Sequence, residues 1–497
     1  MADQYDIIII GGGVIGCMIA RYLSRYQLKI LLIDKESDVG STTSAANSAL
    51  VHPGYDPVPG SLKAKMNVRA NPMWDELANE LGFDFAPSGD YVVAISKEEL
   101  PKLDRLMQQG RKNGVPGMRL ISGEEMRLRE PLINPQVSGA IFAETGGICD
   151  QFGVVLGAAE NAVQNGVTIL LNTTFTGFIF ENQRIVGIQT NRGEHRCRWV
   201  INAAGLFADE VMHLAGIRPE FKITPRRGEY FILDRAEMVI QSVYFPVPTE
   251  ISKGILVANT THGNPLLGPN AQEIHDKEDR SNSSEGLQEV LDGAKKLIPS
   301  LNPRTIIATF AGLRAGGNAA CETPGVSYEH DFIIEIPHAV KGLVNLGGIE
   351  SPGLTCAPAI ALYVMELMKE AGEILEEKKN WNPIRPPRPR FRYLDNNQRQ
   401  ALIQKDEKYG RIVCRCENIT EGEIVAEIHS PIPARTYDAI KRRTWLGTGR
   451  CQGGFDMPRV TAILARELGI DPLQVSKKGA GSEFLSRPTK IVEVQDA

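Results

Sequence analysis

The feature that most constrains the fold is a glycine loop near the start of the chain, Gly11-Gly-Gly-Val-Ile-Gly16. It follows a short apolar run, Tyr5–Ile10, and precedes a helical apolar pattern over Val14–Arg25; a second apolar run, Leu28–Ile33, comes next. Continuous apolar runs of this length are typical of strands that are covered on both faces. The opening therefore predicts a β-α-β unit of about thirty residues and an α/β fold with a parallel sheet.

The spacing of the loop predicts a bound dinucleotide. Glycines permit a tight turn and a close approach of the backbone, and the unpaired N–H groups at the start of the helix bind a pyrophosphate. Asp34 follows the second apolar run, where a carboxylate accepts hydrogen bonds from ribose hydroxyl groups. The motif itself leaves open whether the dinucleotide is NAD or FAD.

Length, charge and cysteine content narrow the class of protein. The 497 residues suggest about three domains, and a net charge of −5 gives no general attraction to nucleic acid. The acidic start MADQYD is followed by an apolar stretch that glycines interrupt, so we expect neither a signal peptide nor a membrane span. We therefore expect a cytoplasmic protein. Eight cysteines are too few for a disulfide framework. Five of them stand singly and are expected to be buried thiols: Cys17, Cys149, Cys197, Cys321 and Cys356.

Later segments predict that the chain leaves the first domain and returns to it. Trp199–Gly205 and Gly342–Gly347 are each predicted to be a buried strand that runs into small residues. Between them, Gly228–Asp234 and Lys253–Ala258 are predicted to be strands of a separate antiparallel layer. Pro383–Arg390 contains four prolines and three arginines, which favours extended chain and marks a domain boundary. Helices are predicted beyond it around Thr420–His429 and Pro458–Leu468.

Several motifs, in a fixed order over residues 1–375, resemble the FAD-dependent D-amino-acid-oxidase-type superfamily. They are the glycine loop, Thr43–Ser48 leading to His52–Tyr55, Asn202–Gly205 and Gly347–Gly353. Within that superfamily, Pro59–Lys65 resembles L-2-hydroxyglutarate oxidases. Three other segments resemble the large subunits of anaerobic glycerol-3-phosphate dehydrogenases: Arg227–Tyr230, Thr261–Asn264 and Ile349–Leu354.

The resemblance implies an α/β architecture in which a Rossmann-like FAD-binding domain carries an inserted antiparallel-sheet substrate domain. We expect the FAD-binding domain to be discontinuous, over residues 1–85, 145–215 and 335–375. The substrate domain is expected over 86–144 and 216–334, a linker over 376–409, and a small helical, cysteine-bearing domain over 410–485.

The resemblance also implies that FAD is held without a covalent bond. Gly353, Leu354 and Thr355 precede an apolar helical stretch, so their N–H groups could face the flavin N1/O2 edge, where negative charge accumulates on reduction. A close contact between helix and sheet is the alternative explanation of these small residues. The residues expected to bind FAD are Gly11, Gly13, Gly16, Asp34, Lys35, Thr43, Ser44, Asn47, Ser48, Ala204, Gly205, Gly348, Gly353, Leu354 and Thr355.

Oxidation of a hydroxy compound by a flavin needs a cationic group for the substrate anion and a base for the hydroxyl proton. Arg314 resembles the arginine that binds the substrate carboxylate or phosphate in this superfamily, and a guanidinium group suits either anion. His262 and His52 are the candidate bases, and we prefer His262 slightly. Lys253 and Lys63 are candidates for a second cation. The alternative for each is an ordinary structural or solvated side chain.

The cysteines near the C-terminus resemble a small domain named after bacterioferritin-associated ferredoxin, which carries a [2Fe–2S] cluster on four cysteines. Cys414, Cys416 and Cys451 match that pattern, but Asp456 stands where the fourth cysteine is expected. Asp456 could be an oxygen ligand, another group or water could complete the set, or the metal could be lost. Because thiolates match cluster iron better than a carboxylate does, we expect a degenerate or absent cluster. A zinc site is a weaker alternative, since C-x-C is not the usual zinc spacing.

These resemblances favour oxidation of sn-glycerol 3-phosphate to dihydroxyacetone phosphate, with electrons passing through FAD. The alternatives are oxidation of L-2-hydroxyglutarate or another 2-hydroxy or amino acid, and a non-catalytic electron-transfer subunit. A second redox subunit is a candidate electron acceptor that could hold the protein at the inner membrane. Dioxygen is another candidate acceptor.

Overall fold

The computed structural model describes residues 4–217, 219, 221–236, 238–248, 254–319 and 331–488, without the side chains of residues 318 and 319. The chain divides into two compact units. The first comprises Met1–Lys35 and Val39–Arg385, and the second comprises Glu36–Asp38 and Pro386–Ala497. Among the described residues, no helix combines the length and the apolar composition that a bilayer crossing requires.

A six-stranded sheet forms the centre of the first unit. Its order is β20 (Ile333–Glu335), β21 (Leu343–Gly347), β13 (Trp199–Asn202), β1 (Ile7–Ile10), β2 (Ile30–Ile33) and β9 (Thr168–Leu170). All neighbours are parallel except β20, which runs antiparallel to β21. Every residue of β1, β2 and β13 is buried, as the continuous apolar runs predicted.

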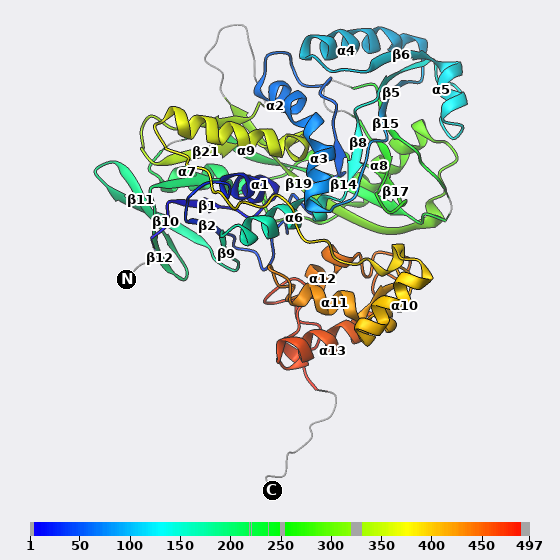
Figure 1. Ribbon diagram of the computed structural model, residues 1–497. Helices are drawn as coiled ribbons and strands as arrows, with labels where there is room; N and C mark the ends of the chain where they lie inside the picture. Colours follow the sequence, from blue (N-terminus) through cyan, green and yellow to red (C-terminus); the bar gives the residue numbers. More distant parts are fainter. Residues whose placement is uncertain are drawn as a thin grey trace. The chain divides into compact units, whose positions relative to one another are not determined.

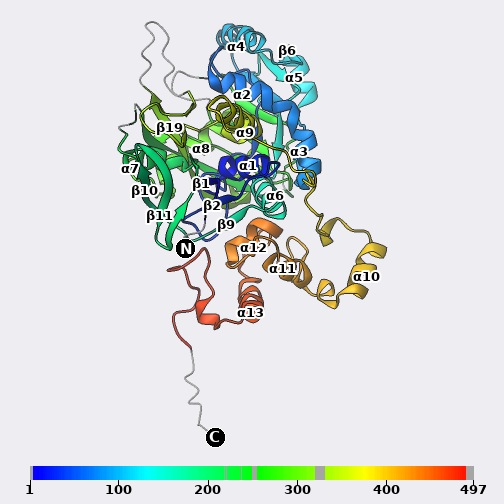
Figure 2. The same ribbon diagram turned by 60° about the vertical axis from the view of Figure 1, so that its left-hand side comes forward.

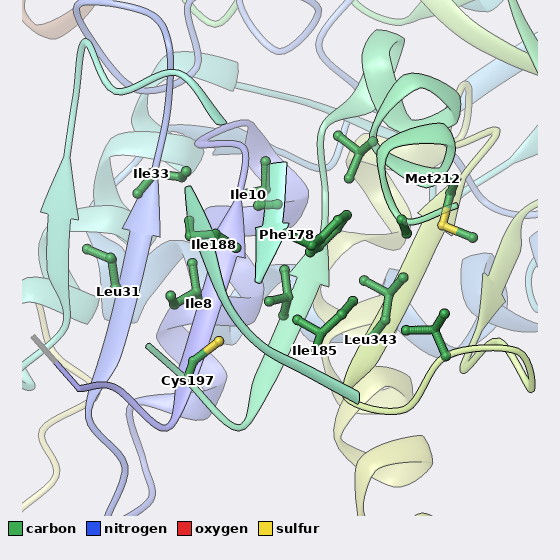
Figure 3. Packing of buried hydrophobic residues seen from close by; sticks show 14 of the residues in the cluster. Ile8, Ile10, Leu31, Ile33, Phe178, Ile185, Ile188, Cys197, Met212 and Leu343 are labelled. Carbon is green, nitrogen blue, oxygen red and sulfur yellow. The ribbon is translucent and has the colours of Figure 1, made fainter. Parts of the chain in front are cut away.

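Helices cover one face of this sheet and a second, smaller sheet covers the other. Helix α1 (Val14–Leu23) packs between α9 (Gly353–Glu370) and α6 (Gln151–Gln164) (Figures 1 and 2). The small sheet consists of β10 (Phe175–Glu181), β11 (Arg184–Thr190) and β12 (Gly193–Arg196). Figure 3 shows Ile8 and Leu31 of the central strands packed with Ile185 of the small sheet. Alternate residues of each central strand therefore point to opposite faces of the sheet, one toward the helices and the next toward the small sheet.

A nine-stranded, mostly antiparallel sheet forms the second layer of the first unit. Its order is β18 (Gln272–Glu273), β14 (Phe221–Leu233), β17 (Pro265–Leu267), β16 (Val257–Asn259), β15 (Val243–Pro246), β5 (Asp90–Ala94), β7 (Gly139–Ala143) and β6 (Met118–Ser122), and β19 (Ile306–Ala319) pairs with β14. The predicted strand at Gly228–Asp234 is part of the longer β14. The one predicted at Lys253–Ala258 begins only at Val257, and Lys253 lies outside the described residues.

Shorter elements complete the first unit. They are the small sheet β3 (Leu50–Val51), β8 (Gly147–Cys149) and β4 (Phe85–Ala86), and the helices α2 (Leu62–Ala70), α3 (Trp74–Leu81), α4 (Leu100–Asn113), α5 (Gly123–Arg129), α7 (Ala208–Leu214) and α8 (Ser284–Leu297). The predicted α/β class with an antiparallel sheet inserted between returns to the parallel sheet is confirmed.

The second unit is small and mainly helical, as predicted. It contains α10 (Asn396–Lys405), β22 (Ile412–Cys414), β23 (Ile419–Thr420), α11 (Glu421–Ile428), α12 (Tyr437–Thr444) and α13 (Met457–Leu468). The start of the predicted linker is not a free connection, because it belongs to the first unit, where the Lys378 N–H donates to the Arg25 carbonyl at 2.7 Å. The domain boundaries themselves stay a prediction.

Candidate active site

The parallel sheet brings the predicted cofactor-binding segments to one edge. Adjacent strands β21, β13, β1 and β2 all end at this edge, because they are parallel. Gly348, Ala204, Gly11 and Asp34 follow these four strands in that order. Ligands of open α/β sheets bind beyond the carboxyl ends of the strands, so this edge is the candidate nucleotide site.

The glycine loop has no room for side chains at two of its positions. Gly11 has φ +108°, and a Cβ there would lie 2.4 Å from the Ala203 carbonyl oxygen. A Cβ on Gly16 would lie 1.9 Å from the Gly11 carbonyl oxygen. Gly13 supplies no side-chain cap to α1, so apart from the Val14 N–H, which Ser44 accepts, the first N–H groups of the helix have no capping side chain. This backbone fits the pyrophosphate that the spacing predicts.

Two side chains fix the loop from either side. The Gly12 N–H donates to Asp34 Oδ2 at 2.6 Å, and the Val14 N–H donates to Ser44 Oγ at 2.9 Å. Lys35, in contrast, pairs with Glu278 at 2.8 Å and lies over the Phe207 ring. Asp34 and Ser44 therefore fix the backbone of the loop, while the Lys35 ammonium is held by protein groups. The roles of all three in binding stay predictions.

The segment Thr43–Ser48 joins the nucleotide loop to the antiparallel sheet. Thr43 Oγ1 donates to the Leu313 carbonyl on β19 at 2.9 Å. A Cβ on Gly312 would lie 1.9 Å from the Ala46 carbonyl oxygen, so the strand passes directly against this segment. Asn47 braces it from within, since its Nδ2 donates to the Ser44 carbonyl at 2.9 Å. The chain that contacts the glycine loop is thereby fixed to the strand that carries Arg314.

The start of α9 lies beside His52. The His52 N–H donates to Thr355 Oγ1 at 3.0 Å, and Thr355 Oγ1 donates to the Leu50 carbonyl at 3.2 Å. Helix α9 begins at Gly353, and Pro352 offers no side-chain cap, so Leu354 and Thr355 present N–H groups without intrahelical acceptors. These N–H groups fit the predicted contact with the flavin N1/O2 edge, and that assignment stays a prediction.

Arg314 has a guanidinium group that the protein uses only in part. On β19 it stands opposite Arg226 of β14. Its Nε donates to the Arg226 carbonyl at 3.4 Å and its Nη2 to the Asn270 carbonyl at 2.5 Å. Within the described residues Nη1 has no hydrogen-bond acceptor. Burial lowers the pKa of Arg314, as expected for a desolvated cation.

A buried carboxylate that the sequence analysis did not single out organises the neighbouring cations. Glu350 pairs with Lys63 Nζ at 3.0 Å and with Arg226 Nη2 at 3.1 Å. Burial alone would raise the pKa of Glu350, but the charges of Lys63 and Arg226 outweigh it and lower the pKa. Neither Glu350 nor Arg226 was singled out from the sequence. Both lie in or beside a quoted motif, since Glu350 lies inside Ile349–Leu354 and Arg226 precedes Arg227–Tyr230.

The structure brings His52 to this group and does not bring His262. The His52 Nε2 lies 3.4 Å from the hydroxyl of Ser351, the residue after Glu350. His262 occupies the turn between β16 and β17, where the neighbouring Asn264 donates to the Leu233 carbonyl at 2.9 Å. Leu233 is about seven residues along β14 from Arg226, on the order of 20 Å. On this geometry we prefer His52 to His262, and the assignment of the base stays a prediction.

Two of the three C-terminal cysteines lie close together. Cys416 and Cys451 have their sulfur atoms 3.8 Å apart. Burial, with a smaller contribution from the hydrogen-bonded Asp456, raises the pKa of Cys414 to about 11. Asp456 Oδ1 accepts the Tyr437 hydroxyl at 2.6 Å, and its Oδ2 is buried without a partner in the described chain. In that same part of the chain no group of three or more His, Cys, Asp or Glu side chains is arranged to hold a metal ion.

Comparison with known proteins assigns the first unit. Residues 6–367 match the protein-family model described as "FAD dependent oxidoreductase". The chain belongs to this family. The predicted FAD cofactor and the predicted class of enzyme, a flavin-dependent oxidoreductase, are thereby confirmed. Residues 412–466 of the flavoprotein match a second model, described as "BFD-like [2Fe-2S] binding domain", which confirms the resemblance stated for the cysteine-bearing region.

Several characterised proteins are similar to this flavoprotein. A glycerol 3-phosphate dehydrogenase of Caloramator mitchellensis is 43% identical over 99% of this chain and 100% of its own. The structure of an L-α-glycerophosphate oxidase from Mycoplasma pneumoniae with FAD bound is 33% identical, with a TM-score of 0.72, over 78% of this chain and 100% of its own. The human mitochondrial L-2-hydroxyglutarate dehydrogenase is 33% identical over 54% of this chain and 61% of its own.

Proposed function

We propose that this flavoprotein oxidises sn-glycerol 3-phosphate to dihydroxyacetone phosphate. The observation that carries the proposal is the similarity to the Caloramator glycerol 3-phosphate dehydrogenase, which extends over 99% of this chain and all of that protein. The geometry supports it, because Arg314 offers a guanidinium Nη1 that is not used by the described protein groups. Such a group suits a phosphate or a carboxylate.

The residues at the carboxyl edge of the parallel sheet have separate roles in the proposed reaction. FAD, when bound, supplies the acceptor for the hydride of the substrate C–H bond. Arg314 orients the substrate through its anionic group, since a fixed anion places the reacting carbon reproducibly. His52 Nε2, beside the Ser351 hydroxyl at 3.4 Å, takes the proton of the oxidised hydroxyl group.

The proposal is tested by anaerobic reduction of the purified holoprotein. Addition of sn-glycerol 3-phosphate is expected to bleach the oxidised flavin band, and dihydroxyacetone phosphate is expected in an amount equal to the flavin reduced. L-2-hydroxyglutarate, other hydroxy acids and amino acids serve as the comparison set. Bleaching by one of these while glycerol 3-phosphate stays inert would reverse the choice of substrate. A flavin that no small molecule reduces would favour the electron-transfer subunit instead.

The assignment of the base yields a matched pair of variants. His52→Gln is expected to slow flavin reduction by about 10²-fold or more, the usual contribution of a positioned base. His262→Gln is expected to stay within about threefold of the unchanged protein, because His262 lies in a turn at the far end of β14. Both are measured as limiting rates of anaerobic reduction by stopped flow. A slow reduction in His262→Gln with a nearly unchanged rate in His52→Gln would make His262 the base.

L-2-hydroxyglutarate is the second candidate substrate. The similarity to the human L-2-hydroxyglutarate dehydrogenase favours it, but over 54% of this chain only.

A second redox subunit as electron acceptor is part of our proposal and is supported by the match to a [2Fe–2S] binding domain at residues 412–466. A cytoplasmic location, with attachment to the inner membrane through that subunit, is also part of it.

A further inference from the structure

Three cations converge where a single arginine would be enough to bind a carboxylate. Arg314 and Arg226 are directly opposite each other on neighbouring strands, so both side chains leave the same face of the strand pair. Lys63 reaches the same carboxylate as Arg226, that of Glu350. Arg314 also acts electrostatically on Glu350, which places all three cations within range of one carboxylate. Two positive charges of this group are therefore not balanced by Glu350.

The second nearby carboxylate is used elsewhere. Asp331 accepts the N–H groups of Leu62 and Lys63 at 2.7 and 2.9 Å, and so caps the start of α2. Its oxygens thus face the backbone of the helix rather than Arg226. Within the described residues, Glu350 is the carboxylate that both Arg226 and Lys63 contact.

Arg226 keeps hydrogen-bonding capacity that the protein does not use. Its Nη2 donates to Glu350 at 3.1 Å, whereas its Nε is buried and has no acceptor in the described chain. The Arg226 side chain is 27% exposed, against 5% for Glu350. A buried N–H without an acceptor is costly unless a ligand or water satisfies it. Arg226 therefore combines a fixed position with an unused donor.

We propose that Arg226, positioned by Glu350 together with Lys63, binds the phosphate beside Arg314 and selects a dianionic phosphomonoester over a monoanionic carboxylate. A phosphomonoester carries about −1.5 to −2 charges near neutral pH and three terminal oxygens. One guanidinium group pairs two oxygens, so the third oxygen and the second charge need another cation. The inference deepens the proposed function and rests on it for the identity of the substrate.

Glu350 acts as a positioning residue in this arrangement. Without it, Lys63, Arg226 and Arg314 would repel one another in the absence of substrate, since like charges at short range destabilise a partly buried site. With it, Arg226 is held in place before the phosphate arrives. Less side-chain freedom is then lost on binding, which favours affinity.

The test uses the full-length holoprotein with Arg226→Gln. The half-saturating concentration of sn-glycerol 3-phosphate in anaerobic flavin reduction is expected to rise by about 10- to 100-fold, as for the loss of a charged hydrogen bond. The limiting rate is expected to change by less than about fivefold, because Arg226 acts in binding. Inorganic phosphate, used as a competitive inhibitor, is expected to weaken by a similar factor.

Two further variants make the test specific. Lys222→Gln removes an exposed positive charge from the same strand and is expected to behave as the unchanged protein. Arg226→Lys keeps the charge but loses the planar fork, so an intermediate rise in half-saturation is expected. FAD content and the flavin spectrum report whether each variant is folded.

The outcomes separate this inference from the proposed function. If the unchanged protein is not reduced by glycerol 3-phosphate, the proposed function is wrong. If it is reduced, and Arg226→Gln leaves both the half-saturation and the phosphate inhibition unchanged, only the role of Arg226 is overturned. Should Arg226→Gln lose FAD, Arg226→Lys decides in the same way: a rise of about fivefold or more supports the role, and no rise overturns it.

Discussion

Replacing Arg314 with leucine is expected to leave a flavin-containing protein that its substrate no longer reduces. The Thr43–Ser48 segment and the glycine loop do not depend on the guanidinium group, because Thr43 bonds the backbone carbonyl of Leu313 rather than a side chain. FAD content is therefore expected to persist. The apparent second-order rate of reduction by glycerol 3-phosphate is expected to fall by about 10²- to 10³-fold, the cost of removing a charged partner from a partly buried anion.

The structural cost of this substitution has to be separated from the catalytic one. Arg314 donates to the backbone carbonyls of Arg226, Arg227 and Asn270, and its loss removes these hydrogen bonds. A cost of about 1–3 kcal/mol in unfolding free energy is expected for the group. Thermal unfolding of the holoprotein measures this part. Arg304→Leu, at an exposed position just before β19, is the matched control and is expected to leave reduction unchanged.

An unchanged rate of flavin reduction in Arg314→Leu would remove Arg314 from the anion site. A variant that folds but contains no FAD would mean that the guanidinium group supports the cofactor rather than the substrate. Arg314→Lys distinguishes a need for charge from a need for the planar fork, since lysine keeps only the former.

The nucleotide-binding half could be predicted from the sequence because its signals are local. The apolar run Tyr5–Ile10, the glycine loop and the helical pattern after it are adjacent in the chain, and the structure has β1, the loop and α1 in that order. Each signal has a direct physical cause: a Cβ at Gly16 would overlap the Gly11 carbonyl oxygen. Local pattern and tertiary structure agree here, as they do in most well-specified elements.

The substrate side could be predicted only in part because its geometry depends on contacts between distant residues. Arg226 and Glu350 form an ion pair although they are 124 positions apart in the chain, and no periodic pattern in the sequence predicts that they meet. His52 and His262 both stand beside small-residue turns, and the sequence favoured His262 only slightly. The strand pairing that places Leu233 far from Arg226 favours His52 instead. The spacing of motifs along the chain does not predict which residues of two distant strands stand opposite each other.

The C-terminal domain illustrates a different limit, since its fold was predictable while its expected metal content rests on the replacement of one cysteine by Asp456. The residues around the cysteines are closely packed: a Cβ at Gly449 would lie 2.5 Å from the Cys416 Cβ, and one at Gly453 would lie 2.4 Å from the Tyr437 hydroxyl. Cys414 and Asp456 are both buried. The sequence of this region matches its family, and Asp456 stands where a fourth cysteine is expected.

Restoring the fourth thiol with Asp456→Cys is expected to give the largest change in metal content. The unchanged protein, purified anaerobically, is expected to contain well below two iron and two acid-labile sulfide per chain, because a carboxylate bound to the Tyr437 hydroxyl is a poor substitute for a thiolate. The variant is expected to contain about two of each. Cysteine is no larger than aspartate, so the buried position accommodates it, at the cost of the acceptor for Tyr437.

Asp456→Ser is the matched control, because serine has the size of cysteine but offers no thiol. It is expected to bind no more iron than the unchanged protein, and Cys451→Ser in the Asp456→Cys background is expected to lose what was gained. Iron and sulfide assays, with electron paramagnetic resonance of the reduced protein, measure the result. About two iron and two sulfide per chain in the unchanged protein would contradict the expectation, and the fourth ligand would then be Asp456, with its unpaired Oδ2, another group or water.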